Sequence, residues 1–311
     1  MIQMNKYSEE FEEIYKKKVF RIVDKETRSK IVESTKKYFP KCFFSLMDSD
    51  GVFEKLILSE YRDLRKIYIY IRMMTRAEMN KECFCETKKK RNKLYDDYYQ
   101  TFEKVRDCHL NKEKMNVRIV RESGMITCPY CNRDYINSRG KEAAGAQLDH
   151  FYNCADFPIF SLCLYNLVPS CANCNRIKSA QEKRLLSPYD TSIDLDKEII
   201  FGYEPEEPEC YEDIRIKMDI SKKMQNNFSV FNLKEAYAIH NEEIQELVKK
   251  HDTYVNSQIE ELYDVVKEGK IEVTREEIKE MIFGHEIRQE QYGKRPLSKL
   301  RHDIMKKLGV Y

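Results

Sequence analysis

The sequence lacks the long apolar runs and targeting signals that mark membrane and secreted proteins. No hydrophobic stretch in its 311 residues approaches the roughly 20 residues that cross a bilayer. The amino-terminal residues MIQMNKYSEEFEEIYKKK contain no signal-peptide core. We therefore expect a cytoplasmic protein with no membrane partner, in a compartment where cysteine thiols stay reduced and available to a metal.

A strong net charge is also missing. The chain has 55 Lys and Arg against 53 Asp and Glu, which leaves a net charge of +2. Any surface that binds nucleic acid must therefore be a local basic patch rather than a property of the whole chain. No internal repeat or low-complexity tract is visible, and the length and the 41% hydrophobic content are sufficient for two or three small domains.

The most informative residues are two Cys-x-x-Cys pairs, Cys128/Cys131 and Cys171/Cys174. Two such pairs meet the ligand count and the short spacing of a closed tetrahedral zinc site. They predict a structural Zn²⁺ that holds together the two ends of residues 132–170. The alternative is a set of buried reduced thiols, which the paired spacing disfavours.

The remaining cysteines do not have this spacing. Cys154 and Cys163 fall between the two pairs but lack a Cys-x-x-Cys partner, so we assign them no chemistry. Cys83-Phe84-Cys85 has the wrong spacing for a zinc knuckle and Cys108-His109 is isolated. We expect no second zinc site from these residues.

Residues 128–179 resemble an HNH endonuclease of the His-Me finger, or ββα-metal, superfamily. The resemblance rests on an ordered set of motifs: Cys-x2-Cys, Leu-Asp-His, Tyr-Asn-Leu-x-Pro-Ser and Cys-x2-Cys-Asn-x2-Lys. The following Ser187-Pro188-Tyr189-Asp190 is also similar to bacterial members. The resemblance implies a β-hairpin followed by a helix, with a metal held between the first strand and the helix.

The resemblance also implies roles for individual residues. His150 becomes the general base, Asp149 a ligand of the catalytic metal and Asn175 its second ligand, while Asn166 braces the loop that orients His150. Many relatives carry histidine where this chain has Asn175, but an amide oxygen can still bind a hard cation. Lys178, three residues further on, is expected to reach a substrate phosphate.

These residue types suit phosphodiester hydrolysis, which needs a deprotonated water and stabilisation of charge on the phosphate. A histidine with a reference pKa of about 6.5 is mostly neutral at pH 7 and can accept a proton. The oxygens of Asp149 and Asn175 suit Mg²⁺ or Mn²⁺, whereas thiolates suit zinc. Other interpretations are a helix cap or a packed core histidine for Asp149-His150, and turn or capping roles for Asn166 and Asn175.

The predicted fold class is α+β, mainly helical, with a central zinc-stapled ββα module flanked by helical regions. We expect a helical region over 1–117, the nuclease module over 118–190, and a strand pair with a helical region over 191–311. Hydrophobic spacing predicts the individual elements. The expected helices cover 11–22, 53–80, 233–266 with a break near 249–252, and a segment from a capping box at Thr274 through Met281; the expected strands cover 198–203 and 213–221.

The basic run Lys88–Lys93, with Tyr95, Tyr98 and Tyr99 after it, is the best candidate for an accessory contact to a DNA backbone. The alternative is a solvated helix face. The four histidines at 240, 251, 285 and 302 are expected to have packing or surface roles.

We therefore expect a metal-dependent endonuclease that hydrolyses DNA. An RNase or a toxin nuclease is an alternative, because the scissile phosphate is common to both nucleic acids. A non-catalytic zinc-ribbon adaptor that binds nucleic acid or protein is another. The resemblance implies a role as an effector in anti-phage defence or restriction, with an ATPase or sensor as a partner.

Overall fold

A computed structural model gives the fold of the chain. It describes residues 1–36, 48–77, 99–179, 184–269 and 272–311. The basic run at 88–93, together with Tyr95 and Tyr98, lies outside the described residues. The described chain is mainly helical with three small antiparallel sheets, which confirms the predicted α+β class.

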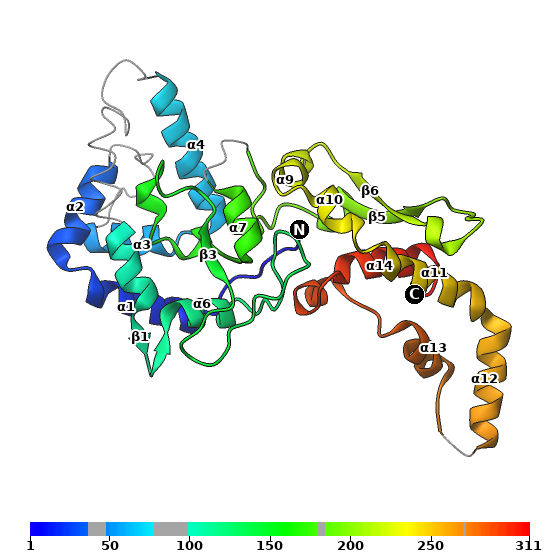
Figure 1. Cartoon of the computed structure of the whole chain (residues 1–311). Coiled ribbons are helices and arrows are strands. Elements are labelled where there is room, and N and C mark those ends of the chain that lie inside the picture. The colour runs from blue at the N-terminus through cyan, green and yellow to red at the C-terminus, as the bar shows by residue number, and fades with distance from the viewer. Residues whose placement is uncertain (37–47, 78–98, 180–183, 270–271) are drawn as a thin grey trace.

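The amino-terminal region is helical (Figure 1). Its helices are α1 (Glu9–Ile22), α2 (Lys25–Lys36), α3 (Ser49–Ile57) and α4 (Tyr61–Ala77), followed by helical residues 99–107. Helix α1 begins at Ser8, whose hydroxyl accepts a hydrogen bond from the Phe11 N–H at 3.2 Å. It buries Phe11, Tyr15 and Val19 at four-residue spacing. The predicted helix over 11–22 is confirmed.

The single helix predicted over 53–80 is wrong, because the chain breaks between α3 and α4. The break lies at Ser59, whose hydroxyl donates to the Lys55 carbonyl at 2.6 Å while its N–H donates to the Leu56 carbonyl at 3.2 Å. A serine that bonds to nearby backbone competes with helix continuation. Periodicity did not reveal the break, because apolar residues continue on both sides of it.

A strand–strand–helix unit lies in the middle of the chain. Strand β3 (Gln147–His150) pairs antiparallel with β4 (Leu167–Ser170), so that Asp149 lies opposite Val168 and His150 opposite Leu167. Helix α7 (Ala172–Lys178) follows β4 directly. Two short 3-10 helices, η2 (Pro158–Phe160) and η3 (Leu164–Asn166), form part of the connection between the strands. The unit is preceded by strands β1 (His109–Leu110) and β2 (Glu113–Lys114) and by helix α6 (Met115–Glu122).

The carboxy-terminal region contains a second hairpin and the remaining helices. Strands β5 (Ile199–Glu204) and β6 (Arg215–Ile220) pair antiparallel, which confirms the predicted strand pair. Helix α14 (Ser298–Lys307) packs on β5, where the Asp303 carboxylate accepts from the Phe201 N–H at 3.0 Å. The other elements are α8 (Leu195–Glu198), η4 (Tyr211–Asp213), α9 (Gln225–Val230), α10 (Leu233–Ala238), α11 (Asn241–Thr253), α12 (Asn256–Glu268), α13 (Arg275–Phe283) and η5 (Gln289–Lys294).

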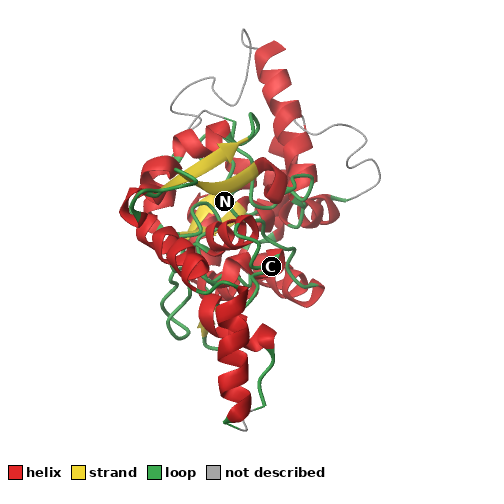
Figure 2. Cartoon of the chain, turned by 90° about the vertical axis from the view of Figure 1, so that its right-hand side faces the viewer, coloured by secondary structure: helices red, strands yellow, loops and turns green. Residues whose placement is uncertain are grey.

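The long helix predicted over 233–266 is three helices, α10 to α12. One break lies at Ile239–His240 and the second at Tyr254–Val255, slightly beyond the break predicted at 249–252. The capping box at Thr274 is confirmed, because its hydroxyl accepts from the Glu277 N–H and the Glu277 carboxylate accepts from the Thr274 N–H. Helices α12 and α13 form a hairpin that projects from the rest of the molecule in both views (Figures 1 and 2).

One hydrophobic core includes residues from all three predicted regions. The amino-terminal segment runs along the central unit, where the Ile2 N–H donates to the Pro129 carbonyl and the Met4 N–H to the Pro188 carbonyl, both at 2.8 Å. The region boundaries near 117 and 190 remain a prediction. Within the part of the chain that the structure describes, no helix combines the length and apolar character needed to span a bilayer.

Candidate metal centre and active site

The four paired cysteines meet in space. Their sulfur atoms all lie within 4.8 Å of one another, and all four residues are buried. Cys171 is the cap residue of α7, where its sulfur accepts from the Cys174 N–H at 3.4 Å. A tetrahedral zinc site with Zn–S bonds of about 2.3 Å places its sulfurs about 3.8 Å apart. The cluster therefore has the donors and the spacing to hold a metal ion such as zinc.

The protonation behaviour of these thiols also favours a cation. Hydrogen bonds from the neighbouring cysteine thiols hold the pKa of Cys131 well below its usual range. The same bonds raise the pKa of Cys171 and of Cys174. One thiolate therefore forms readily, while further negative charge in the same buried space is costly unless a cation compensates it.

Packing against the carboxy-terminal region holds the first cysteine pair in place. Asn132 is buried with a positive φ of 53°, and its amide donates to the Tyr292 carbonyl at 2.9 Å while its side-chain oxygen accepts from the Ser298 hydroxyl at 3.1 Å. The Tyr237 hydroxyl donates to the Cys131 carbonyl at 2.8 Å. Sequence reasoning missed these residues; an asparagine directly after a Cys-x-x-Cys turn was the only local signal.

Asp149 has both carboxylate oxygens engaged by side chains of the same unit. The Tyr130 hydroxyl donates to Oδ2 at 2.6 Å and the Lys178 ammonium donates to Oδ1 at 3.0 Å. Lys178 also donates to the His150 carbonyl at 2.8 Å. Lys178 is 3% exposed and Asp149 is 5% exposed. The predicted contact of Lys178 with a substrate phosphate thus requires its ammonium to leave this buried pair.

His150 is also buried, at the end of β3. Its Nε2 lies 3.1 Å from the Ser161 carbonyl oxygen, and its ring packs edge-on against Phe102 with centroids 4.5 Å apart. A carbonyl can only accept, so Nε2 carries the proton in the neutral ring and Nδ1 keeps its lone pair. Burial lowers the pKa of His150 to about 4, so the imidazole is neutral at pH 7 and can accept a proton.

Asn166 makes the contacts of a loop brace. Its side-chain oxygen accepts from the Tyr152 N–H at 2.8 Å, and its amide donates to the carbonyls of Tyr152 and Phe160, both at 3.1 Å. Its own carbonyl accepts from the Phe151 N–H at 2.8 Å. These bonds fix the chain on both sides of the carbonyl that contacts His150. The role implied for Asn166, orienting His150 for catalysis, remains a prediction.

Asn175 lies half-buried on α7, one turn before Lys178. Its amide donates to the Gln147 side-chain oxygen at 2.6 Å, and Gln147 is two residues before Asp149 on the same face of β3. The two predicted cation ligands, Asp149 and Asn175, therefore both lie where strand β3 packs against helix α7. The fit to a divalent cation is incomplete in this arrangement, because the ammonium of Lys178 takes one oxygen of Asp149 and Tyr130 takes the other.

The other reactive side chains lie in different environments. Burial raises the pKa of Cys154 to about 11 and the pKa of Cys163 further, so both stay protonated. His251 and His285 pair with the acidic residues Asp252 and Glu280. Within the described ranges, the four-cysteine cluster is the only group of three or more His, Cys, Asp or Glu side chains arranged to share a metal.

Comparison with known proteins does not assign this chain to a family or a function. No protein-family model, curated protein or solved structure matches this chain.

Proposed function

We propose that this protein is an endonuclease that hydrolyses DNA phosphodiester bonds through the strand–strand–helix unit β3–β4–α7. The observation that carries the proposal is the state of His150. The Ser161 carbonyl holds its Nε2 proton, and burial keeps the ring neutral, so Nδ1 is prepared to accept a proton from water. The four-cysteine cluster and the Asn166 brace support it, since they fix both ends of the segment that presents His150.

In the proposed reaction, Nδ1 of His150 takes a proton from a water molecule, and that water attacks the phosphorus atom. The P–O bond to the leaving sugar oxygen then breaks, and solvent water supplies the proton that this oxygen takes up. The Ser161 carbonyl stabilises the imidazolium that forms, because it already accepts from Nε2. A pKa of about 4 in the closed arrangement makes the imidazole a weak base. Access of water and phosphate raises its basicity by reversing part of the desolvation.

Access to His150 requires movement of Phe102, which packs on the imidazole from helical residues 99–107. Arg106 on the same helical stretch is close enough for its charge to lower the pKa of His150. Displacement of Phe102 by a nucleic-acid strand would leave this guanidinium beside an incoming phosphate. The proposal therefore includes a rearrangement of residues 99–107 when substrate binds.

The proposed activity includes a divalent cation, Mg²⁺ or Mn²⁺, with Asp149 and Asn175 as its oxygen ligands. Such a cation would stabilise charge on the phosphate. Each oxygen of Asp149 already accepts one hydrogen bond, so a cation bound at this position would compete with the ammonium of Lys178 and release it from the carboxylate. The released ammonium would then be free for a substrate phosphate, which is the role expected of Lys178 from its sequence position.

The direct test is incubation of purified protein with plasmid, single-stranded DNA and RNA, each in Mg²⁺, Mn²⁺ or EDTA. We expect nicked and linear plasmid in the presence of either cation and none in EDTA. Cleavage of RNA but not of DNA would identify RNA as the substrate of the same hydrolysis reaction. Intact nucleic acids in every condition, with zinc-loaded and folded protein, would contradict the proposal.

A second candidate is a non-catalytic zinc module that binds a partner. The observation that favours it is the closed Asp149–Lys178 pair, which serves a structural unit without any chemistry. His150 separates the two proposals, because an adaptor does not need an imidazole with a free Nδ1. An adaptor would bind nucleic acid or protein with the same affinity after His150→Ala and would cleave nothing.

A further inference from the structure

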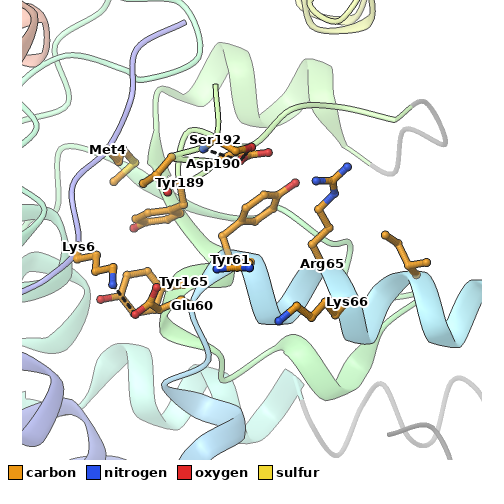
Figure 3. A pocket seen from close by; sticks show the side chains of 13 residues that line it. Met4, Lys6, Glu60, Tyr61, Arg65, Lys66, Tyr165, Tyr189, Asp190 and Ser192 are labelled. Carbon is orange, nitrogen blue, oxygen red and sulfur yellow. Dashed lines mark hydrogen bonds and ion pairs between the residues drawn. The ribbon is translucent and has the colours of Figure 1, made fainter. Parts of the chain in front are cut away.

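An opening that His150 does not line lies beside the first turns of α4 (Figure 3). It is a cavity of about 410 Å³ bounded by α4, by the amino-terminal segment around Met4 and by the turn from Tyr189 to Ser192. Pockets that bind small molecules have volumes of about 300 to 1,000 Å³. The cavity is therefore large enough for a small ligand or for one unit of a polymer.

The floor of this cavity is aromatic and rigid. Tyr61, Tyr165 and Tyr189 line it together with Met4, and all four are buried. The Tyr61 ring lies parallel to Tyr152, with an interplanar angle of 7°. The Tyr189 hydroxyl donates to the hydroxyl of Tyr7 at 3.0 Å. The tyrosines are held before any ligand arrives, and they offer apolar ring surface that suits a flat ring.

Two arginines on α4 line the open side of the cavity. Arg62 and Arg65 are exposed, and neither forms an ion pair or hydrogen bond with any residue in the described ranges. Neighbouring lysines are already neutralised: Lys66 pairs with Asp63 at 2.8 Å and Lys6 pairs with Glu60 at 2.5 Å. Figure 3 shows Arg65 and Tyr61 rising from the same side of α4. Two free guanidinium forks match the oxygens of a phosphate.

The turn on the other side of the cavity supplies hydrogen-bond acceptors. Asp190 is 8% exposed, and its Oδ1 accepts from the N–H and the hydroxyl of Ser192 at 3.1 and 2.5 Å. Its Oδ2 has no hydrogen bond to the described residues. A carboxylate oxygen with free capacity at the cavity favours a ligand that donates, such as a base amine or a sugar hydroxyl.

We propose that this cavity binds a nucleotide, with the base against the tyrosine floor, the phosphate at Arg62 and Arg65, and a ring amine or sugar hydroxyl at Asp190. The nucleotide can be a free molecule or one unit of a nucleic-acid strand, since both present the same groups. A phosphotyrosine side chain shares the ring and the phosphate, but it has no donor for Asp190. The cavity thus favours the nucleotide.

Calorimetric titration of the full-length protein tests this site. The ligands are the four nucleoside 5′-monophosphates, adenosine, inorganic phosphate, phosphotyrosine and a 5′-phosphorylated trinucleotide. We expect at least one nucleotide to bind tenfold or more tightly than adenosine, phosphate or phosphotyrosine. The double variant Arg62→Gln/Arg65→Gln should lose tenfold or more in affinity. Arg72→Gln, on an exposed position of the same helix outside the cavity, should bind like the wild type.

Binding of the monophosphate identifies a free nucleotide as the ligand, and binding of the trinucleotide alone identifies a strand unit. Three results would overturn the site: phosphate alone binding as tightly as any nucleotide, equal losses in the Arg72→Gln variant, or phosphotyrosine binding at least as tightly. The readout is independent of cleavage. His150→Ala should retain full nucleotide affinity, so failure here and failure of the proposed nuclease activity are distinguishable.

Discussion

The two ends of the strand–strand–helix unit differ in how complete they are. At one end four buried cysteine sulfurs converge within 4.8 Å of one another. At the other end each carboxylate oxygen of Asp149 already accepts a hydrogen bond, one from Tyr130 and one from Lys178. The first arrangement brings together donors that could hold a metal ion such as zinc, whereas the second is already paired with a cation of the chain itself, the Lys178 ammonium.

Under the proposed function, this difference separates a structural role of the cysteine cluster from a reactive role of Asp149 and His150. A structural metal site is closed and its ligands face inward, so folding alone brings them together. A reactive site must accept water, substrate and an ion in turn, so an internal partner can occupy it until then. Under the proposed function, Lys178 is that partner for Asp149, and Phe102, which packs edge-on against the imidazole, is that partner for His150.

Loss of a cysteine should have the largest effect on stability. Cys128→Ser or Cys174→Ser should yield insoluble or zinc-free protein, because binding of structural zinc contributes about 10 to 16 kcal/mol of apparent free energy in small zinc domains. Elemental analysis and thermal unfolding measure the effect. Cys210→Ser is the control, since Cys210 is exposed and outside the cluster. A soluble and fully active Cys128→Ser/Cys174→Ser variant would exclude structural zinc.

Breaking the buried pair should have the next largest effect. Lys178→Met leaves the Asp149 charge buried without its cation, and loss of one partner of a buried ion pair costs about 3 to 5 kcal/mol. Adding Asp149→Asn should recover most of the loss, because the uncompensated charge is then gone. Urea unfolding measures both variants, with Lys66→Met as a control at an exposed ion pair. An unchanged midpoint for Lys178→Met would show that the pair is open in solution.

Removal of the Asn166 loop brace should lower the free energy of unfolding by less than loss of the buried ion pair. Asn166→Ala leaves the Tyr152 N–H and two carbonyls without their partner, and an unsatisfied buried polar group costs about 1 to 3 kcal/mol. Urea unfolding should show this loss, and cleavage should fall with it because the Ser161 carbonyl is displaced from His150. Asn153→Ala is the control in the same loop and should lose less, because it removes only part-buried or exposed bonds to Ala155 and Asp156. Equal stabilities for the two variants would rule out the brace.

Asn175→Ala should have the smallest effect on stability, below about 0.5 kcal/mol, because the side chain is half-exposed on a short helix. Its effect on cleavage should nevertheless be large if its oxygen binds the cation. The metal concentration for half-maximal rate should rise for Asn175→Ala. Asn175→Asp should keep metal binding and Asn175→His part of the activity. If the metal dependence of Asn175→Ala equals that of the wild type, Asn175 is not a metal ligand and its side chain serves only the bond with Gln147.

Sequence spacing predicted those features that depend on local order. The convergence of the cysteines, the strands β5 and β6 and the capping box at Thr274 follow from short motifs. The burial of Lys178 was not predictable from its position three residues after Asn175, because helical spacing does not specify which face of α7 packs on β3. The contact of Asn132 with the carboxy-terminal region joins residues far apart in sequence, and a local pattern does not encode it.

The central claim is that His150 acts as a base, and single-turnover cleavage of plasmid DNA by His150→Ala tests it most directly. We predict a rate about 10² to 10⁴ times below that of the wild type, the usual contribution of general-base catalysis. Zinc content and DNA affinity should be unchanged, which distinguishes lost chemistry from lost folding. Wild-type turnover in the His150→Ala variant would contradict the account.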